Sequence, residues 1–463
     1  MKKTLIATSL AGALMLSSCT MGPKYQRPAA ELPQNIRGGV PDLATVKNQS
    51  LADLPWWELF RDPSLQELIR TALKQNYDLQ IAAEKVTQAR AQLGITRAAQ
   101  YPSVEGQAAA NGAKDVSTFH SNFFTVAPDA IFQLDLFGSL RKATEAQRAN
   151  LLATEAARQN VVLTLVSEVA ADYFQLLTLD AELATAQETV DAQRESVKLT
   201  TLKMEHGTAS RVDVLQAQQV LDTANAAIPD LERQITQTEN ALNILAGKLP
   251  DNIQRGQLLT EQYQPPQVPT GLPSELLQRR PDIREAEEQL VAANAEIGVA
   301  RAAFFPSISL GGSVGGAYGR NSSFVSSMPT HFDTWSYSAA VTQPIFNAGK
   351  LRNNLRATES QQRQAVLGYR QAIQRSFGEA SDAVVGYEKF RQVQSRQEDS
   401  VRDLKENVEL SNQRYRAGIT SYMEVLDAQR SLFSAQQSLV QARGNELQGL
   451  VALYKVLGGG WKQ

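Results

Sequence analysis

Cysteine and histidine are almost absent from this chain of 463 residues, which contains one cysteine and three histidines. A single cysteine excludes an intramolecular disulfide and a metal site built from several cysteines. His120, His206 and His331 are isolated from one another, so a histidine metal site is not expected. The chain also lacks a nucleophile elbow and a paired acid–base constellation, so we expect neither an enzyme nor a cofactor.

Long apolar runs and an excess of one charge are missing too. The 46 basic and 48 acidic residues leave a net charge of −2, which argues against a nucleic-acid partner. Beyond the N-terminal segment, no apolar run reaches the roughly 18 residues that a membrane helix needs. If the mature chain crosses a membrane, we therefore expect it to do so as β-strands.

The N-terminus has the pattern of a lipoprotein signal. A short basic start precedes an apolar run, Leu5–Leu16, which is too short to span a bilayer and is typical of a secretory signal. The small residues before Cys19 resemble a bacterial lipobox, which predicts removal of residues 1–18 and acylation of Cys19. The following Thr20 is not an aspartate, which indicates the outer membrane. An ordinary signal with an incidental cysteine is the alternative.

One structural unit occurs twice in the chain. Ile95-Thr-Arg-Ala-Ala-Gln-Tyr-Pro-Ser-Val104 recurs 204 positions later as Val299-Ala-Arg-Ala-Ala-Phe-Phe-Pro-Ser-Ile308. His206-Gly-Thr-Ala-Ser-Arg-Val-Asp-Val-Leu-Gln-Ala-Gln218 recurs 211 positions later as Ala417-Gly-Ile-Thr-Ser-Tyr-Met-Glu-Val-Leu-Asp-Ala-Gln429. The second copy is therefore longer between Pro306 and Gly349. A repeat of this length is no solenoid repeat, and it predicts two similar halves side by side.

Each half contains a stretch in which apolar and polar residues alternate, as in a strand hairpin. The apolar positions are Val104, Gly106, Ala108, Ala110, Phe124, Val126, Ala130, Phe132 and Leu134 in the first half, and Ile308, Leu310, Val314, Tyr318, Trp335, Tyr337, Ala339 and Val341 in the second. Aromatic residues gather near the expected hairpin tips: Phe119, Phe123, Phe124, Phe324, Trp335 and Tyr337. Strands of about ten residues with this pattern are typical of a transmembrane β-barrel, although soluble sandwiches alternate too.

Four strands cannot close a barrel, and open strand edges are not tolerated in lipid. Several chains must therefore share one barrel. The glycine-rich stretch Gly311–Gly316 lies in the strand pattern without a βαβ context, so we interpret it as strand glycines rather than a phosphate loop.

Long helical hairpins follow both strand hairpins. The predicted helices and turns are Ser139–Glu205, His206–Thr208 and Arg211–Leu245 in the first half, and Lys350–Arg416, Ala417–Ile419 and Ser421–Leu457 in the second. The first of these helices contains neither proline nor glycine, whereas Pro229 should bend the first return helix. Their Ala-rich composition predicts packing against neighbours from other chains.

The shorter segments complete the organisation. A helix is predicted from Pro63, followed by a second helix that Asp78 can cap. The predicted segments are a signal peptide (1–18), an extended arm (19–63), helices of the first repeat (64–102), a strand hairpin (103–138), a long helical hairpin (139–247), an equatorial linker (248–273), helices of the second repeat (274–306), a second strand hairpin (307–346), a second long helical hairpin (347–458) and a tail (459–463).

Several motifs together resemble outer-membrane efflux proteins of the TolC/OprM type, in the NodT lipoprotein group. The most specific piece is Leu276-Leu-Gln-Arg-Arg-Pro-Asp-Ile-Arg-Glu-Ala-Glu287, which continues through Ala295-Glu-Ile-Gly-Val-Ala-Arg-Ala-Ala-Phe-Phe-Pro306. Further matching pieces are Gly22–Pro28, Trp56-Trp57 with Phe60, Gln343–Gly349, Arg414–Gly418 and Val425–Arg430. The resemblance covers essentially the whole mature chain.

The resemblance implies a mixed α+β membrane protein with an internal duplication. It implies a homotrimer in which each chain gives four strands to a 12-stranded transmembrane β-barrel and its helical hairpins to one long α-helical barrel. Such a trimer would be the exit duct of a tripartite efflux pump that exports drugs or other small toxic compounds. Its partners would be a periplasmic adaptor (membrane fusion protein) and an inner-membrane RND pump.

The same resemblance implies a place for the protein. It would be anchored by lipid on Cys19 in the outer membrane of a Gram-negative bacterium and would extend into the periplasm. The exit duct of a type I protein secretion system and a periplasmic coiled-coil scaffold lipoprotein without a pore are the alternatives. The lipobox favours the efflux duct over the protein-secretion duct. The alternating strands argue against a scaffold without a pore.

The resemblance also implies a gate at the periplasmic ends of the helical hairpins. Glu424 and Asp427, one i, i+3 step apart, match carboxylates that line the constriction in this family. Asp213 and Tyr415 resemble the pair that latches the tunnel shut by a hydrogen bond between helices. A solvated helix face is the alternative interpretation of the two carboxylates.

Some family members have a basic latch residue at the position of Thr420, so that latch would be missing here or relocated to Arg211 or Arg416. Met204 and Met423 lie near the two turns and could suggest copper export, but two methionines without a clustered motif favour packing.

The two turns themselves are the candidate docking points for the adaptor. They contain Gly207 and Thr208 in the first copy and Gly418 and Ile419 in the second. Glycine permits the positive φ with which the chain reverses after a helix.

Overall fold

The computed structural model describes residues 21–29, 54–114, 120–263, 277–322 and 329–459, with the side chains of 111–123, 320–322, 329–330 and 332 outside the description. The predicted signal peptide and Cys19 therefore lie outside the described residues. The chain divides into two compact units. The strand unit comprises Met1–Ala30, Glu84–Ala156 and Arg284–Gln371, and the hairpin unit comprises Glu31–Ala83, Ala157–Ile283 and Ala372–Gln463.

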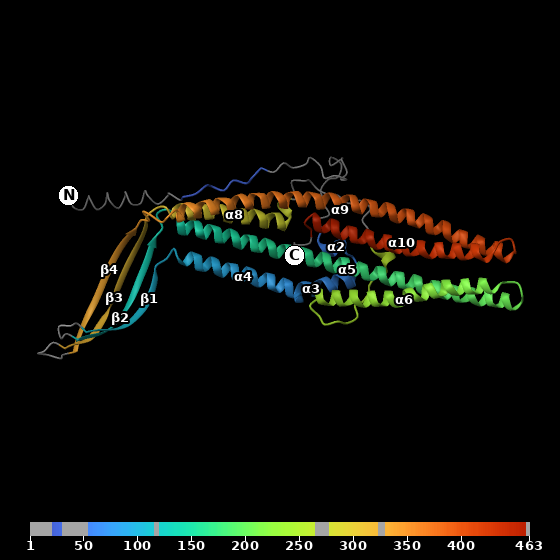
Figure 1. Cartoon of the computed structure of the whole chain (residues 1–463), viewed down its shortest axis with the longest axis horizontal. Helices are drawn as coiled ribbons and strands as arrows, with labels where there is room; N and C mark the ends of the chain where they lie inside the picture. The colour runs from blue at the N-terminus through green and yellow to red at the C-terminus, as the bar shows by residue number, and fades with distance from the viewer. Residues whose placement is uncertain (1–20, 30–53, 115–119, 264–276, 323–328, 460–463) are drawn as a thin grey trace. The chain divides into compact units, whose positions relative to one another are not determined.

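The strand unit contains one four-stranded antiparallel sheet in the order β1-β2-β3-β4 (Figure 1). Its strands are β1 (Ser103–Lys114), β2 (His120–Leu134), β3 (Ser307–Ser322) and β4 (Pro329–Thr342). The strands are longer than the ten residues expected. The register of β3 and β4 continues to Arg320 opposite Pro329.

The predicted alternation places the apolar residues on one face of the sheet. Across the strands, Tyr337 lies opposite Gly312, Gly312 opposite Ala130, and Ala130 opposite Val104, so these positions share a face. Large side chains on this face are open to the surroundings, with Tyr337 80% and Trp335 73% exposed. The opposite face presents mainly Ser, Thr and Gln positions. The sheet therefore exposes a broad apolar face that no described residue covers.

The glycines of β3 permit close approach of neighbouring strands. A Cβ atom on Gly315 would lie 2.2 Å from the carbonyl oxygen of Val126, and one on Gly311 would lie 2.6 Å from Ser338 Oγ. The interpretation of this glycine-rich stretch as a strand, rather than a phosphate loop, is confirmed.

The helices occur in two matching sets. The bounds are α2 Trp56–Leu59, α3 Pro63–Gln75, α4 Tyr77–Ala98, α5 Ser139–Glu205, α6 Arg211–Leu245, η2 Leu259–Glu261, α8 Pro281–Ala302, α9 Lys350–Arg416 and α10 Tyr422–Val456. α4 and α8 both have 22 residues, α5 and α9 both have 67, and α6 and α10 both have 35. Element lengths thus follow the sequence repeat, and the longer part of the second copy lies between α8 and α9.

Two local expectations are corrected. Asn76, not Asp78, caps α4, because α4 begins at Tyr77 and the Asn76 side chain accepts a hydrogen bond from the Leu79 amide at 2.9 Å. The arm predicted as extended contains the short helix α2, whose Trp56 is only 5% exposed. Trp56 and Phe60 join the hydrophobic core instead of lying along a loop.

A third expectation concerned membrane-length apolar segments. α5 contains an 18-residue window of mean hydropathy 1.4, so the expectation that no such stretch exists was wrong. Two thirds of that window (67%) is buried inside the protein. Buried core helices of soluble proteins can have the same length and composition. Burial within the core of the hairpin unit accounts for its composition, since Val166, Val169 and Tyr173 are fully buried there.

A buried carboxylate holds the core of the hairpin unit together. Asp62 is fully buried and caps α3 by accepting from the Ser64 amide at 2.8 Å. Its other oxygen accepts from Tyr173 Oη at 3.0 Å and from the amide of Gln257 at 2.9 Å. Gln262 Nε2 donates to the same oxygen at 2.9 Å. One side chain thereby joins α3, α5 and the segment that follows α6.

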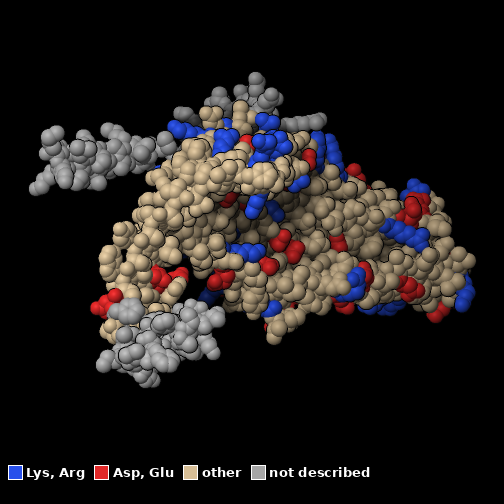
Figure 2. Space-filling model, turned by 60° about the vertical axis from the view of Figure 1, so that its left-hand side comes forward, with Lys and Arg blue, Asp and Glu red and all other residues tan. Residues whose placement is uncertain are grey.

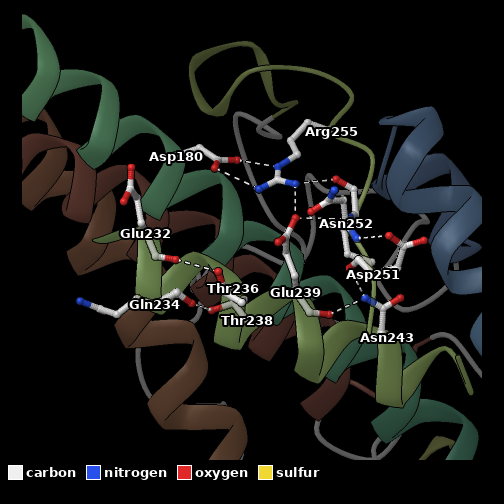
Figure 3. A network of polar contacts seen from close by, with 11 residues as sticks. Asp180, Glu232, Gln234, Thr236, Thr238, Glu239, Asn243, Asp251, Asn252 and Arg255 are labelled. Atoms are coloured by element: carbon white, nitrogen blue, oxygen red, sulfur yellow. Dashed lines mark hydrogen bonds and ion pairs between the residues drawn. The ribbon is translucent and has the colours of Figure 1, made fainter. Parts of the chain in front are cut away.

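Arg255 fixes the segment after α6, within the predicted equatorial linker, to two helices (Figure 3). Its guanidinium donates to both oxygens of Asp180 on α5, at 2.9 and 3.2 Å, and to Glu239 on α6. Asn243 on α6 donates to the carbonyl of Asp251 at 2.5 Å. The bidentate ion pair thus holds the described part of this segment, up to residue 263, against both helices.

A buried arginine accounts for the Arg-Arg-Pro-Asp motif. Arg280 is 7% exposed and lies just before α8. It donates to Asp282 at 2.8 Å and to Glu379 on α9 at 2.6 Å, and it reaches the carbonyl of Val456 at the end of α10 at 3.3 Å. The motif therefore ties the start of α8 to α9 and α10.

The segment after Cys19 is docked in the strand unit. Gly22 has φ +119°, and a Cβ atom there would lie 2.7 Å from the Cα of Gly298 on α8. Arg27 donates to Glu287 on α8 at 2.5 Å and to Tyr369 on α9 at 3.2 Å. The Gly22–Pro28 motif thus fastens the start of the arm along two helices.

Glu446 and Glu398 should give stability opposite dependences on pH. Burial raises the pKa of Glu446 above its usual value, whereas the hydrogen bond from Arg443 lowers the pKa of Glu398. Protonated Glu446 stabilises the folded protein fully when the pH is below the pKa of this side chain in the unfolded chain. This stabilisation is lost as the pH rises through its pKa in the folded protein. Ionised Glu398 stabilises the folded protein when the pH is above the pKa of this side chain in the unfolded chain. This stabilisation is lost as the pH falls through its pKa in the folded protein.

We therefore expect Glu446→Gln to raise the melting temperature at neutral pH more than at pH about 4.5, and Glu398→Gln to lower it mainly at neutral pH. Thermal unfolding of both variants at the two pH values measures the difference. Shifts of the same sign for both variants would contradict the assignment.

Candidate functional site

The two long helical hairpins of the hairpin unit end in the same type of turn. After α5, the Thr208 amide donates to the Lys203 carbonyl at 2.8 Å, and Gly207 has φ +75°. After α9, the Ile419 amide donates to the Arg414 carbonyl at 2.9 Å, and Gly418 has φ +70°. Both are Schellman motifs with glycine in the left-handed position. A Cβ atom would meet nothing within 4 Å at either glycine, so the backbone angle, not packing, selects glycine.

The third residue of the helix that follows each turn has a different role in the two copies. Asp213 forms a capping box with Ser210, whose amide and hydroxyl donate to the Asp213 carboxylate at 2.8 and 2.9 Å. Its counterpart 211 positions later is Glu424. Ser421 makes no side-chain cap of α10, so Glu424 is not used in this way.

Glu424 is instead held by the turn and by the end of α9. Arg414 Nε lies 3.3 Å from Glu424 Oε1, and the Thr420 hydroxyl donates to Oε2. Neither Arg211 nor Arg416, the two predicted replacements for a basic latch, forms an ion pair with a described residue. Sequence reasoning missed Arg414, although a basic residue in the last turn of a helix is a recognisable pattern.

Asp427 lies one helical turn beyond Glu424 and is exposed. Its carboxylate makes no hydrogen bond or ion pair with any residue in the described part of the chain. Of the two carboxylates predicted to line a constriction, Asp427 is therefore the one whose charge the chain itself does not neutralise.

Tyr415 lies where the ends of α5, α9 and α10 meet. Its ring centroid is 5.1 Å from that of Tyr422 and 4.0 Å from Lys203 Nζ. Burial and the negative charge of Asp213 raise the pKa of Tyr415, so its hydroxyl stays a hydrogen-bond donor at neutral pH. No hydrogen bond joins Asp213 and Tyr415 within the described chain.

The Tyr422 side chain links the two hairpins. It is 4% exposed on α10, and its hydroxyl lies 2.5 Å from Ser196 Oγ on α5. It packs in a small core with Ala217 and Val220 of α6 and Val425 of α10. The two hairpin ends are thus joined within one chain, and Tyr415 packs against the edge of this core.

The surface of the turns is exposed and partly apolar. Gly207, Thr208 and Gly418 are exposed, and Ile419 is 71% exposed. Val212, one position into α6, is 60% exposed. Such side chains at a helix end form a surface that a second protein can cover.

Metal chemistry finds no support among the described residues. They contain no group of three or more His, Cys, Asp or Glu side chains placed to hold a metal ion. Met423 is 50% exposed, so the packing role expected for it is not that of a buried core residue.

Comparisons with known proteins agree over nearly the whole chain. The outer membrane efflux protein family model matches residues 68–248 and 272–459. The solvent efflux pump outer membrane protein SrpC of Pseudomonas putida is 39% identical over 458 residues, covering 97% of each chain. The cation efflux system protein CusC of Escherichia coli K12 is 35% identical over 450 residues, covering 97% of this chain and 98% of CusC.

A solved structure matches the fold as well. The open-state MtrE outer membrane channel of Neisseria gonorrhoeae has a TM-score of 0.86 at 31% identity, with 96% of this chain and 99% of MtrE covered.

Proposed function

This chain belongs to the outer membrane efflux protein family, and we propose that it works as a homotrimeric exit duct that closes at its helical hairpin ends. It is an outer-membrane component of an efflux pump in a Gram-negative bacterium, like its relatives. The main observation that supports the proposed gate is that no described side chain neutralises the carboxylate of Asp427 at the end of the hairpin unit. Members of this family are transport components, and we propose no enzymatic activity for this chain.

The unpaired edges of the sheet support a trimer. Within the described sheet, β1 pairs with β2 alone and β4 with β3 alone, so each has a free edge. Lipid does not tolerate unpaired backbone donors, and the broad apolar face needs an apolar environment. Pairing β4 of one chain with β1 of the next continues the antiparallel order. Three chains would then close a 12-stranded barrel.

Exposed apolar residues on the helices also support a trimer. Ile95 on α4 is 65% exposed, Leu367 on α9 63%, and Val393 on α9 49%. A single chain leaves these side chains in water, whereas neighbouring chains in a helical barrel would cover them.

The gate consists of different contributions from the two hairpin ends. Three copies of Asp427 would form an acidic ring that attracts cations. Glu424, paired with Arg414, adds less free charge than its type suggests. Asp213 and Tyr415 would hold neighbouring hairpin ends together, so that the channel rests closed.

Replacing Asp427 by asparagine should reduce the preference of the channel for cations roughly several-fold, because the ring loses its three free charges. Glu424→Gln should change the preference less, since Arg414 already neutralises that side chain. Reversal potentials in a salt gradient across planar bilayers measure both. A larger effect of Glu424→Gln than of Asp427→Asn would contradict this division of roles.

The partners would be a periplasmic adaptor, which docks on Gly207, Thr208, Gly418 and Ile419, and an inner-membrane RND pump. We propose that the pump selects the substrate, and that drugs and other small toxic compounds are exported. SrpC is named for solvents and CusC for cations, so this chain resembles ducts of both kinds. A lipid on Cys19 would anchor the arm, which Gly22 and Arg27 fasten to the helices.

A further inference from the structure

Each strand hairpin is flanked by two arginines at equivalent places in the two repeats. Arg97 and Arg301 lie in the last turns of α4 and α8, directly before the strands. Arg141 and Arg352 are each the third residue of the helix that follows the strands, α5 and α9. The spacings of 204 and 211 are those of the repeat itself.

The four junctions between strands and helices are basic as a group. The junction segments 96–102, 135–148, 300–306 and 343–359 contain eight basic residues and three acidic ones. The basic residues are Arg97, Arg141, Lys142, Arg148, Arg301, Lys350, Arg352 and Arg356. Figure 2 shows Lys and Arg side chains gathered in the upper part of the view.

Four of these basic residues lie in the first turns of helices, where positive charge is unexpected: Arg141 and Lys142 in α5, and Lys350 and Arg352 in α9. The positive end of the helix dipole and the free amides of the first turn favour acidic residues. α5 and α9 have none in their first turns. Cations there are electrostatically unfavourable unless an anion comes close.

All three acidic residues of the junctions are already paired within the chain. Asp135 lies 3.2 Å from Arg141, and Glu145 lies 2.6 Å from Lys142. Glu359 lies 3.5 Å from Arg301. Lys350, Arg352 and Arg356 make no ion pair with a described residue, and copies of the same junctions would bring no spare carboxylate. The anion must therefore come from elsewhere.

Apolar residues separate the basic residues from the strands. Ile345 and Phe346, between β4 and α9, are 96% and 88% exposed. Tyr101, between α4 and β1, is 59% exposed, and Phe304 before β3 is 39% exposed. Aromatic residues next to the strands and cations a turn or two further on match the order of a membrane boundary. At about 1.5 Å per residue, Arg356 lies only about 9 Å along α9 from its start.

We propose that Lys350, Arg352 and Arg356, with Arg97 and Arg148, form a collar that binds the phosphate groups of anionic phospholipids in the periplasmic leaflet. The inference rests on the proposed function, because it requires that the four strands cross the outer membrane. Arginine binds phosphate through its planar fork, and each basic residue at a membrane surface favours anionic lipid. The collar would fix the height of the sheet in the bilayer.

The same helix provides a matched control. Arg352→Gln/Arg356→Gln removes two charges within about two turns of the helix start. Arg363→Gln/Arg370→Gln removes two exposed charges from the same face of α9, about 20 and 30 Å from its start. The two double variants differ in distance from the junction but not in charge.

The test uses the full-length protein in detergent with mixed phosphatidylglycerol and phosphatidylcholine, and native mass spectrometry counts the lipids that stay bound. We expect the parent and the Arg363/Arg370 variant to enrich phosphatidylglycerol roughly threefold, and the Arg352/Arg356 variant to lose most of this enrichment. High salt should reduce it in all three. No preference in the parent, or equal loss in both variants, would overturn the proposal.

Two further arms separate the possible failures. Inorganic phosphate alone should not protect the parent against thermal unfolding, whereas phosphatidylglycerol should; protection by phosphate alone would overturn a lipid collar. Planar-bilayer conductance in pure phosphatidylcholine tests the channel itself. A parent that conducts without preferring anionic lipid refutes only the collar, whereas a parent that neither inserts nor conducts refutes the proposed function.

Discussion

Replacing Asp62 by alanine is expected to cost about 4 kcal/mol of unfolding free energy, close to the largest effect of a single substitution. The change removes the cap of α3 and leaves the Tyr173 hydroxyl and the Gln257 amide without their acceptor in a buried place. The yield of folded protein and its melting temperature measure the loss.

Asp78→Ala is the matched control. It makes the same chemical change in the first turn of the next helix, but Asp78 is exposed. We expect it to cost no more than about 0.5 kcal/mol, the size of a helix-dipole contribution. Equal losses for the two variants would show that the hydrogen bonds of Asp62 do not hold the hairpin unit together.

Replacing Gly418 by valine is expected to abolish efflux-dependent resistance without lowering the amount of protein in the outer membrane. Gly418 has φ +70°, where a β-branched residue costs roughly 1–2 kcal/mol, and the turn is exposed. The strain is local, but it displaces the turn and Ile419, which the proposed adaptor contacts. Resistance of a host without its own exit duct, together with quantitative immunoblots, checks both parts.

Gly368→Val provides the comparison for added bulk. Gly368 lies on α9 and is exposed, and a Cβ atom there would meet nothing within 4 Å. Its substitution should leave resistance nearly unchanged. Normal resistance with Gly418→Val would refute a docking role of the turn, and so would an equal loss with Gly368→Val.

Local geometry explains what the sequence could predict. Alternation in β4 needs no knowledge of partners, because every second residue points to the same face, and Trp335 and Tyr337 lie on that face. Gly207 and Gly418 mark the hairpin turns because a positive φ is needed there. The long helices are uninterrupted and rich in helix formers, so their bounds follow closely from composition.

Contacts between distant residues could not be predicted in this way. Asp62 binds Tyr173, 111 positions away, and Gln257, 195 positions away, and no periodicity relates them. The pairing of Arg414 with Glu424 depends on the path of the turn between them, which is why Arg211 and Arg416 were better candidates in the sequence alone. The apolar window of α5 was missed because charged residues interrupt it, although the folded core buries most of it.

The most direct test of a duct closed at its helix ends is single-channel recording of the purified oligomer and of Tyr415→Phe. The parent should give discrete, small currents if Tyr415 and Asp213 hold the ends together as proposed. Removing the hydroxyl deletes only the hydrogen-bond donor and should increase the conductance at least several-fold, because a loss of about 1 kcal/mol at even one of the three equivalent contacts is a factor of about five. Equal conductance in both proteins would contradict the latch, and the absence of discrete currents from an intact oligomer would contradict the channel.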